Sequence, residues 1–149
     1  MMALACLLAA GIASGVAKAD EPQVCLNENG SFEVGPNPGG FTVYSAGQAF
    51  IPNWKVTSAS IDHIGTYFTC SDGNNCIDMD GTPGYGVIET TALTNPGQAY
   101  SLTFDLSGNH QGPPAVKRIV VEVAGQSSSY LDTPGQWTSH SLSFTASSA

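Results

Sequence analysis

The chain has 149 residues, of which 12 are acidic and four are basic, and its formal net charge at pH 7 is −8. Nucleic acids and anionic membrane surfaces are bound through clusters of basic side chains, so this balance excludes both as partners. Seventeen glycines and nine prolines are typical of an all-β domain with frequent turns.

An apolar run opens the chain, from Ala3 to Val16, and it ends at Ala17-Lys18-Ala19. An apolar stretch followed by an A-x-A pattern indicates a secretory signal peptide over residues 1–19. No basic residue precedes the run, and the alternative interpretation is a buried N-terminal helix. No later segment approaches the about 20 apolar residues of a membrane span. We therefore expect a secreted or cell-surface protein with one domain over residues 20–149.

Three cysteines follow the predicted cleavage site. Cys70 and Cys76 enclose a polar loop, and in an exported protein this spacing favours a disulfide over two free thiols or metal ligands. Cys25 is then left over, either as a free thiol or paired with a cysteine outside this chain. Zinc needs four ligands at recognisable spacing, and the three histidines are far apart in the sequence, at His63, His110 and His140.

Short candidate strands recur along the chain, separated by clusters of Gly, Pro, Asn and Ser. The clearest spans residues 99–106, where Tyr100, Leu102, Phe104 and Leu106 alternate with polar residues, which predicts one buried face. A turn at residues 95–97 precedes it. The pattern predicts a β-sandwich with strands at 30–34, 41–44, 54–57, 60–64, 67–70, 76–79, 86–92, 99–106, 116–124, 128–131 and 137–144.

The sequence favours a protein without catalytic activity. Asp78 and Asp80 would share one face of a strand about 7 Å apart, within the roughly 6.5–9.5 Å that separates the carboxylates of inverting glycosidases. Any residues i and i+2 of a strand have this spacing, so we expect an exposed or calcium-binding carboxylate face there. The chain has no Gly-x-Ser-x-Gly motif, and the glycine-rich segment 81–86 lacks the Lys-Ser/Thr of a phosphate-binding loop.

Aromatic residues are the candidate ligand-binding residues, because a flat ring stacks on the apolar face of a sugar while nearby polar side chains bind the hydroxyls. Tyr85 and Tyr130 lie in Gly- or Ser-rich segments and are expected to be the most exposed. Trp54 and Trp137 each begin a strand, where packing in the core is the alternative. Asn109, in the turn after residue 106, is the candidate polar partner. Two further aromatic candidates are Tyr67 and Trp137.

Seven motifs, in order and spacing, resemble the domain-of-unknown-function 642 family, which includes bacterial secreted proteins of the choice-of-anchor C type. They are NGSFE (29–33), IPNWKV (51–56), SIDHI (60–64), IDMDG (77–81), GVIETT (86–91), PGQAY (96–100) and LTFDLSGN (102–109). The resemblance covers residues 29–144, and His63 stands where the family commonly has Tyr.

The resemblance implies a galactose-binding-like jelly roll, related in fold to carbohydrate-binding modules, with the family's closing C-terminal strands absent after Ala149. It implies a non-catalytic role on cell-wall or matrix polysaccharide. It also implies a structural calcium ion, for which Glu33 matches one ligand. The second ligand, an Asp of the last strand, has no counterpart, and calcium prefers about six to eight oxygens.

The leading functional hypothesis is therefore a secreted, non-catalytic domain that binds cell-wall or matrix polysaccharide. The alternative is a structural or adhesive surface protein that assembles through its β-sandwich, which the unassigned Cys25 and the end of the chain soon after Phe144 favour. A glycoside hydrolase that uses Asp78 and Asp80 is the least favoured hypothesis.

Overall fold

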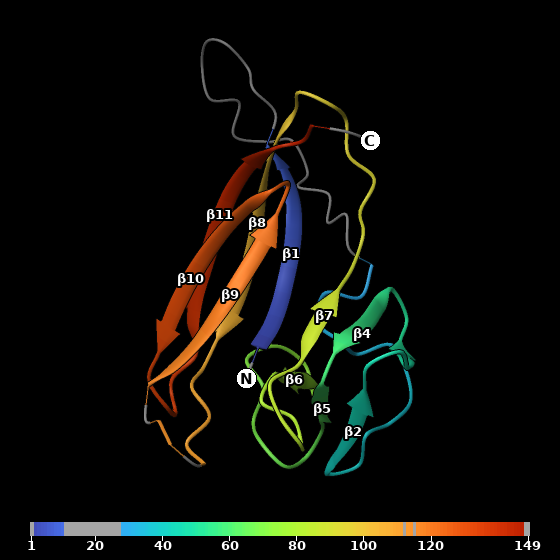
Figure 1. Ribbon diagram of the computed structural model, residues 1–149, viewed down its shortest axis with the longest axis vertical. Coiled ribbons are helices and arrows are strands. Elements are labelled where there is room, and N and C mark those ends of the chain that lie inside the picture. Colours follow the sequence, from blue (N-terminus) through green and yellow to red (C-terminus); the bar gives the residue numbers. More distant parts are fainter. Residues whose placement is uncertain (1, 11–27, 112, 115, 148–149) are drawn as a thin grey trace.

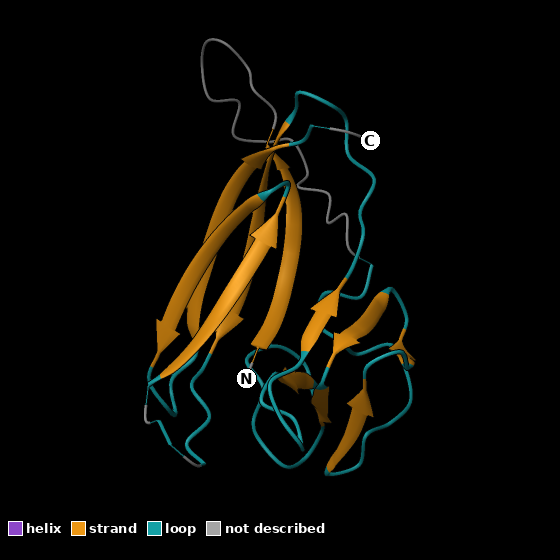
Figure 2. Cartoon of the chain, viewed as in Figure 1, coloured by secondary structure: helices purple, strands orange, loops and turns teal. Residues whose placement is uncertain are grey.

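The computed structural model describes residues 2–10, 28–111, 113–114 and 116–147 (Figure 1). Figure 2 shows that these residues form strands and turns only, and none of them belongs to a helix long and apolar enough to span a membrane. The predicted all-β class is confirmed. The strands are β1 (Met2–Ala10), β2 (Phe41–Ser45), β3 (Ala49–Ile51), β4 (Trp54–Ser58), β5 (Ser60–Ile64), β6 (Cys76–Asp78), β7 (Val87–Glu89), β8 (Ala99–Leu106), β9 (Lys117–Val123), β10 (Gln126–Asp132) and β11 (Thr138–Thr145).

The strands form three antiparallel sheets. The largest has the order β11-β8-β1-β6-β5-β2, the second has the order β3-β4-β7, and the third is the hairpin of β9 and β10. The hairpin crosses the face of β8 and β11 (Figure 1), where the rings of Phe104 and Tyr130 meet edge to face with centroids 5.0 Å apart. This packing of sheet on sheet confirms the β-sandwich, while the jelly-roll order of connections stays a prediction.

The alternating strand predicted at residues 99–106 is β8. Tyr100, Phe104 and Leu106 are at most 5% exposed, so the period of two places one face in the core as expected. On β11, Phe144 pairs with Tyr100, and their rings stack with centroids 5.7 Å apart. The two strands together build one end of the core.

Strand β1 pairs with β8 on the side opposite to β11. Its pairing runs from Met2 opposite Leu106 to Ala10 opposite Ala99, with a bulge between Ala3 and Cys6. Its first residue also pairs with Ile77 of β6. Residues 2–10 therefore form a strand and not the N-terminal helix of the alternative interpretation. The cleavage pattern at 17–19 and Cys25 lie outside the described residues, so the signal peptide stays a prediction.

Strand β5 is buried at all five positions. Strands β2 and β6 pair with its two edges, and Ile61 and Ile64 each pack in a hydrophobic cluster. His63 is completely buried within it. Burial lowers the pKa of His63, while a hydrogen bond to the Phe32 carbonyl and the negative charge of Glu33 act in the opposite direction. The position at which the family commonly has Tyr is thus a core position.

The segment 30–34, predicted as a strand, is a turn. The buried Asn29 amide donates to the carbonyls of Val34 and Pro52 at 2.9 and 3.1 Å and accepts from the Val34 N–H at 3.0 Å. Phe32 has a φ of 62° and is fully buried. A side chain that satisfies the backbone in this way replaces the ladder of a sheet, which the alternation of residue types does not reveal.

The segment 67–70 is also a turn and not the predicted strand. The N–H groups of Gly65 and Tyr67 donate to the Gly40 carbonyl at 2.9 and 3.2 Å. A Cβ at Gly65 would collide with the backbone of Gly39. The turn that begins at Gly65 can therefore approach the turn at Gly39 and Gly40 only because residue 65 is glycine. The turn consequently lies against the start of β2.

Candidate functional site

A row of aromatic rings lies where β2 begins and where the chain turns after β5 and β8. Phe41 is 45% and Tyr67 50% exposed, and their ring centroids are 5.3 Å apart. The row continues edge to face from Tyr67 to Phe68 at 4.8 Å and from Phe68 to His110 at 5.1 Å. We call these four residues, together with Gln111, the aromatic surface.

Hydrogen bonds hold the polar edge of the aromatic surface. The Gln111 Nε2 donates to the Tyr67 hydroxyl at 3.1 Å, and the Gln111 backbone N–H donates to Asn109 Oδ1 at 2.8 Å. Asn109 Nδ2 in turn donates to Asp78 Oδ2 at 2.6 Å. A continuous chain of polar contacts therefore runs from a buried carboxylate to an exposed tyrosine.

Asp78 lies among buried groups and not on an exposed carboxylate face. It ends β6 and is 5% exposed, whereas Asp80 follows the strand in a bend and is exposed. The Asp78 side chain also accepts the Asp80 N–H at 3.1 Å. The expected shared face is therefore wrong, because the strand ends between the two residues.

Asp62 is the cross-strand neighbour of Asp78 and is also buried. Burial raises the pKa of Asp62, the Thr82 backbone N–H that donates to it at 3.3 Å lowers it, and the nearby charge of Asp78 raises it again. The two carboxylates hold the turns after β6 and β8, and so support the aromatic surface from inside.

A disulfide between Cys70 and Cys76 closes the loop below the aromatic surface, as the spacing predicted. Their side chains pack with Ile64, Phe68 and Trp137. The indole N–H of Trp137 donates to the Thr69 carbonyl at 3.1 Å. Trp137 therefore supports the loop, and the alternative of a packing role describes it better than a ligand-binding role.

Glu33 is engaged by the same loop. Its Oε1 accepts the N–H groups of Asn74 and Asn75 at 2.8 and 2.6 Å, and its Oε2 lies 3.4 Å from the Asn75 amide nitrogen. Within the described part of the chain, no group of three His, Cys, Asp or Glu side chains converges as metal ligands do. Glu33 therefore serves as an acceptor for this loop, and the calcium ion that the resemblance implied stays a prediction.

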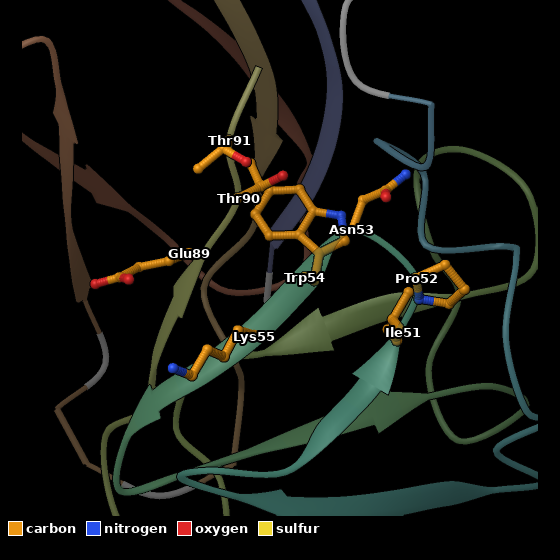
Figure 3. Close-up of a pocket in the computed structure, with 8 residues that line it drawn as sticks. All are labelled: Ile51, Pro52, Asn53, Trp54, Lys55, Glu89, Thr90 and Thr91. Carbon is orange, nitrogen blue, oxygen red and sulfur yellow. The ribbon is translucent and has the colours of Figure 1, made fainter. Parts of the chain in front are cut away.

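Trp54 lines an open cleft of about 610 Å³ beside β3, β4 and β7 (Figure 3). Its side chain is only 7% exposed. The indole N–H donates to the Asn29 carbonyl at 2.9 Å, and the ring lies 5.1 Å from that of Phe32. In Figure 3 the indole lies near Asn53 and Thr90. Trp54 is thus a core residue with one edge in the cleft.

The four predicted ligand-binding residues come from four different parts of the fold: Trp54 from β4, Tyr85 from the segment before β7, Tyr130 from β10 and Asn109 from the turn after β8. Tyr85 is 74% exposed, just before β7, where it forms an isolated bridge with Ser60. Tyr130 lies within β10 and not in a turn, with its half-buried ring 4.8 Å from that of His140. Asn109 alone joins the aromatic surface, and Tyr67 was the only aromatic candidate found there.

Phe41, Phe68, His110 and Gln111 were not among the predicted ligand-binding residues. Phe41 begins a strand and was expected to be an ordinary sheet residue, but β2 is the edge strand of its sheet and its first position is exposed. The Gly-, Asn- and Pro-rich segments next to these residues were the available signal, because binding residues concentrate on loops held by a rigid scaffold.

Comparison with known proteins gives one family and one relative. The family model described as "Protein of unknown function (DUF642)" matches residues 26–149. Halomucin of Haloquadratum walsbyi is 32% identical over 149 residues, which cover 95% of this chain. The chain spans only 2% of the length of halomucin. No solved structure matches the chain significantly.

Proposed function

Because the chain belongs to the DUF642 family, whose function is unknown, we propose its function from its surface chemistry: a non-catalytic, extracellular domain that binds neutral polysaccharide. The observation that carries this proposal is the pair of exposed rings at Phe41 and Tyr67 beside the amide of Gln111. Aromatic faces bind the C–H face of a sugar, and amides exchange hydrogen bonds with its hydroxyls.

The charge of the chain selects the class of glycan. With a net charge of −8, the surface repels uronate and sulfate groups. A neutral hexose polymer carries no such penalty and offers the apolar ring faces that Phe41 and Tyr67 can cover. The disulfide between Cys70 and Cys76 is typical of exported proteins and supports an extracellular location.

Binding is tested with an array of neutral and acidic polysaccharides, followed by calorimetry on the best neutral ligand. In Tyr67→Ala we expect affinity to fall by about tenfold, the equivalent of about 1.4 kcal/mol, because one face of the sugar loses its ring. Gln111→Ala removes the amide beside that ring and is expected to weaken binding in the same direction.

The matched control is Tyr85→Ala, which removes a tyrosine that is even more exposed, 74% against 50% for Tyr67, from a different element. Its affinity should equal that of the unaltered chain. If Tyr85→Ala loses binding while Tyr67→Ala keeps it, the site lies at the turn before β7. Absence of binding to every neutral polysaccharide would contradict the proposed function as a whole.

The second candidate, an adhesive protein that assembles through its β-sandwich, is favoured by the position of β1 at the edge of β8. A hydrolase has less support, because Asp78 already binds Asn109 and the Asp80 N–H. Asp80→Asn should leave polysaccharide binding unchanged, and any hydrolytic activity that disappeared in this variant would revive the hydrolase hypothesis.

A further inference from the structure

The two exposed rings of the aromatic surface are steeply inclined to each other. The planes of Phe41 and Tyr67 meet at 62°, in an edge-to-face contact with centroids 5.3 Å apart. In such a contact, the edge of one ring covers part of the face of the other. One flat sugar ring can therefore stack on Phe41 or on Tyr67, but it cannot stack on both at once.

The rest of the row does not extend either plane. Phe68 is inclined by 74° to Tyr67, and His110 by 79° to Phe68. Phe68 is also half-buried and packs against Ile64 and Cys76, so its ring belongs to the packing beside the disulfide. Because no two neighbouring rings of the row share a plane, the aromatic surface is not a flat platform.

The third exposed ring among the described Phe and Tyr side chains, that of Tyr85, does not continue the row. Tyr85 forms its bridge with Ser60, the first residue of β5, whereas Phe41 pairs with Ile64, the last residue of that strand. The first and last residues of such a strand are about 13 Å apart. Tyr85 and Phe41 therefore lie at opposite ends of β5, and the row of rings stops at Phe41.

The side-chain groups that can bind sugar hydroxyls lie at one of the two exposed rings. The Nε2 and Oε1 atoms of Gln111 are 3.1 and 3.4 Å from the Tyr67 hydroxyl, and the Gln111 backbone is held by Asn109 Oδ1 at 2.8 Å. The side chain of Phe41 has no polar atom. The stacking face and the hydrogen bonds that one hexose needs are therefore both available at Tyr67.

We propose that the aromatic surface binds a single hexose unit of a neutral polysaccharide, and neither several consecutive units nor the flat face of a crystalline polymer. This inference rests on the proposed function. Tyr67 covers the C–H face of the hexose, Gln111 exchanges hydrogen bonds with its hydroxyls, and Phe41 contacts the same unit as an inclined wall. A crystalline face would need rings in one plane, which the angles of the row exclude. Consecutive units would need a further exposed ring beyond Phe41, and the described residues place none there.

The test measures how affinity depends on the length of the glycan. The full chain is titrated calorimetrically with the methyl glycoside of the hexose and with oligosaccharides up to the hexasaccharide, all from the neutral polysaccharide that binds best on the array. From the disaccharide to the hexasaccharide, we expect affinity to rise by no more than about threefold, because a longer chain only offers more copies of the same unit. A clearly steeper rise would overturn the inference, since consecutive units would then have binding sites of their own. Retention on crystalline cellulose or mannan that the oligosaccharides do not compete away would overturn it as well.

Two variants of β2, with melting temperatures that confirm folding, show whether both rings contact the same unit. Phe41→Ala should weaken binding of the methyl glycoside and of the hexasaccharide by the same factor, about threefold or more. A loss confined to the hexasaccharide, or no loss at all, would overturn the inference. Val43→Ala shortens another exposed apolar side chain on the same face of β2, and as the matched control it should leave both affinities unchanged.

The two levels of the proposal fail in different ways. Binding that rises steeply with glycan length and is lost in Tyr67→Ala would retain the proposed function and remove only the single-unit inference. Absence of binding to every neutral glycan of the array would contradict the proposed function and this inference together.

Discussion

His63 is the ionisable side chain for which the fold has the clearest pH consequence. It is fully buried in β5, and burial lowers its pKa. The unfolded chain therefore takes up the proton at a higher pH than the folded chain. The stability that depends on neutral His63 is complete above the unfolded pKa of about 6.5 and is lost as the pH falls from there through the folded pKa.

We predict that the melting temperature of His63→Gln, which cannot take up a proton, falls less between about pH 7.5 and pH 5.5 than that of the unaltered chain. The fall should be smaller by about half or more. Thermal unfolding monitored by circular dichroism measures this difference. His110→Gln, in which an exposed histidine is replaced, is the control and should keep the original profile. Equal profiles for all three chains would show that His63 does not titrate in this range.

The sequence predicts the burial and the structural role of some residues but not of others. The inward positions of β8 follow from alternation alone, because the pleat of a strand has a period of two. The roles of Asn29 and Phe32 do not follow, because they depend on hydrogen bonds to residues as distant as Pro52 and on a φ of 62°. Such positions are set by three-dimensional contacts that a local pattern does not contain.

At the scale of the elements, the hairpin of β9 and β10 explains why Tyr130 is less exposed than expected. The Ser-rich segment 127–129 suggested an exposed position, but the turn consists of Ala124 and Gly125, whose φ values are 49° and 76°. Two residues with positive φ are the mark of a tight hairpin turn that matches the twist of the strands. The serines are therefore strand residues, and Tyr130 lies against the core.

Ala124→Asn should stabilise the protein, because asparagine adopts a positive φ at less cost than alanine, and Asn-Gly is the preferred pair in such turns. We expect a gain of about 0.5–1 kcal/mol in the free energy of unfolding, measured by chemical denaturation. Ala124→Val is the opposite control and should be destabilising. A loss of stability in Ala124→Asn would show that the turn has a different conformation in solution.

The loop that the disulfide closes depends on Glu33. In Glu33→Ala, the N–H groups of Asn74 and Asn75 lose their acceptor. We predict faster amide hydrogen exchange at both residues, with the exchange of β8 unchanged. Glu33→Gln keeps one acceptor oxygen and should show an intermediate effect.

The same measurement tests the expected calcium ion. If Glu33 serves only as an acceptor for the loop, calcium and EDTA should leave the exchange of Asn74 and Asn75 as it is. Slower exchange on addition of calcium, abolished in Glu33→Gln, would support the role that the family resemblance implied for this residue.

At the scale of the whole molecule, the sequence predicted best those properties to which many residues contribute the same signal. Composition and period predicted the all-β sandwich, whereas the expectation from charge that nucleic acid is not a partner stays a prediction. The aromatic surface escaped prediction because it joins three turns, near residues 41, 67 and 110, that are far apart in the sequence. Only the pairing of the strands brings such turns together.

The charge of the whole molecule gives a further prediction. Neutral polysaccharide bound by rings and amides should not respond to screening, so its affinity should change by less than about twofold between about 50 mM and 500 mM NaCl. Isothermal titration at the two salt concentrations measures this. A steep dependence on salt would mean that charged groups, and not Tyr67 and Gln111, carry the binding.

The hydrogen bonds of Asn29 also have a consequence for the chemical ageing of the chain. In the folded protein this amide is 3% exposed and bound to Val34 and Pro52. In an unfolded chain, the Asn29-Gly30 sequence is of the kind most prone to deamidation, because glycine leaves its backbone nitrogen free to attack the amide. The resulting aspartate has no N–H to donate to either carbonyl. A chain that stays unfolded for long therefore loses the side chain that closes its first turn, and ageing of the unfolded form becomes irreversible.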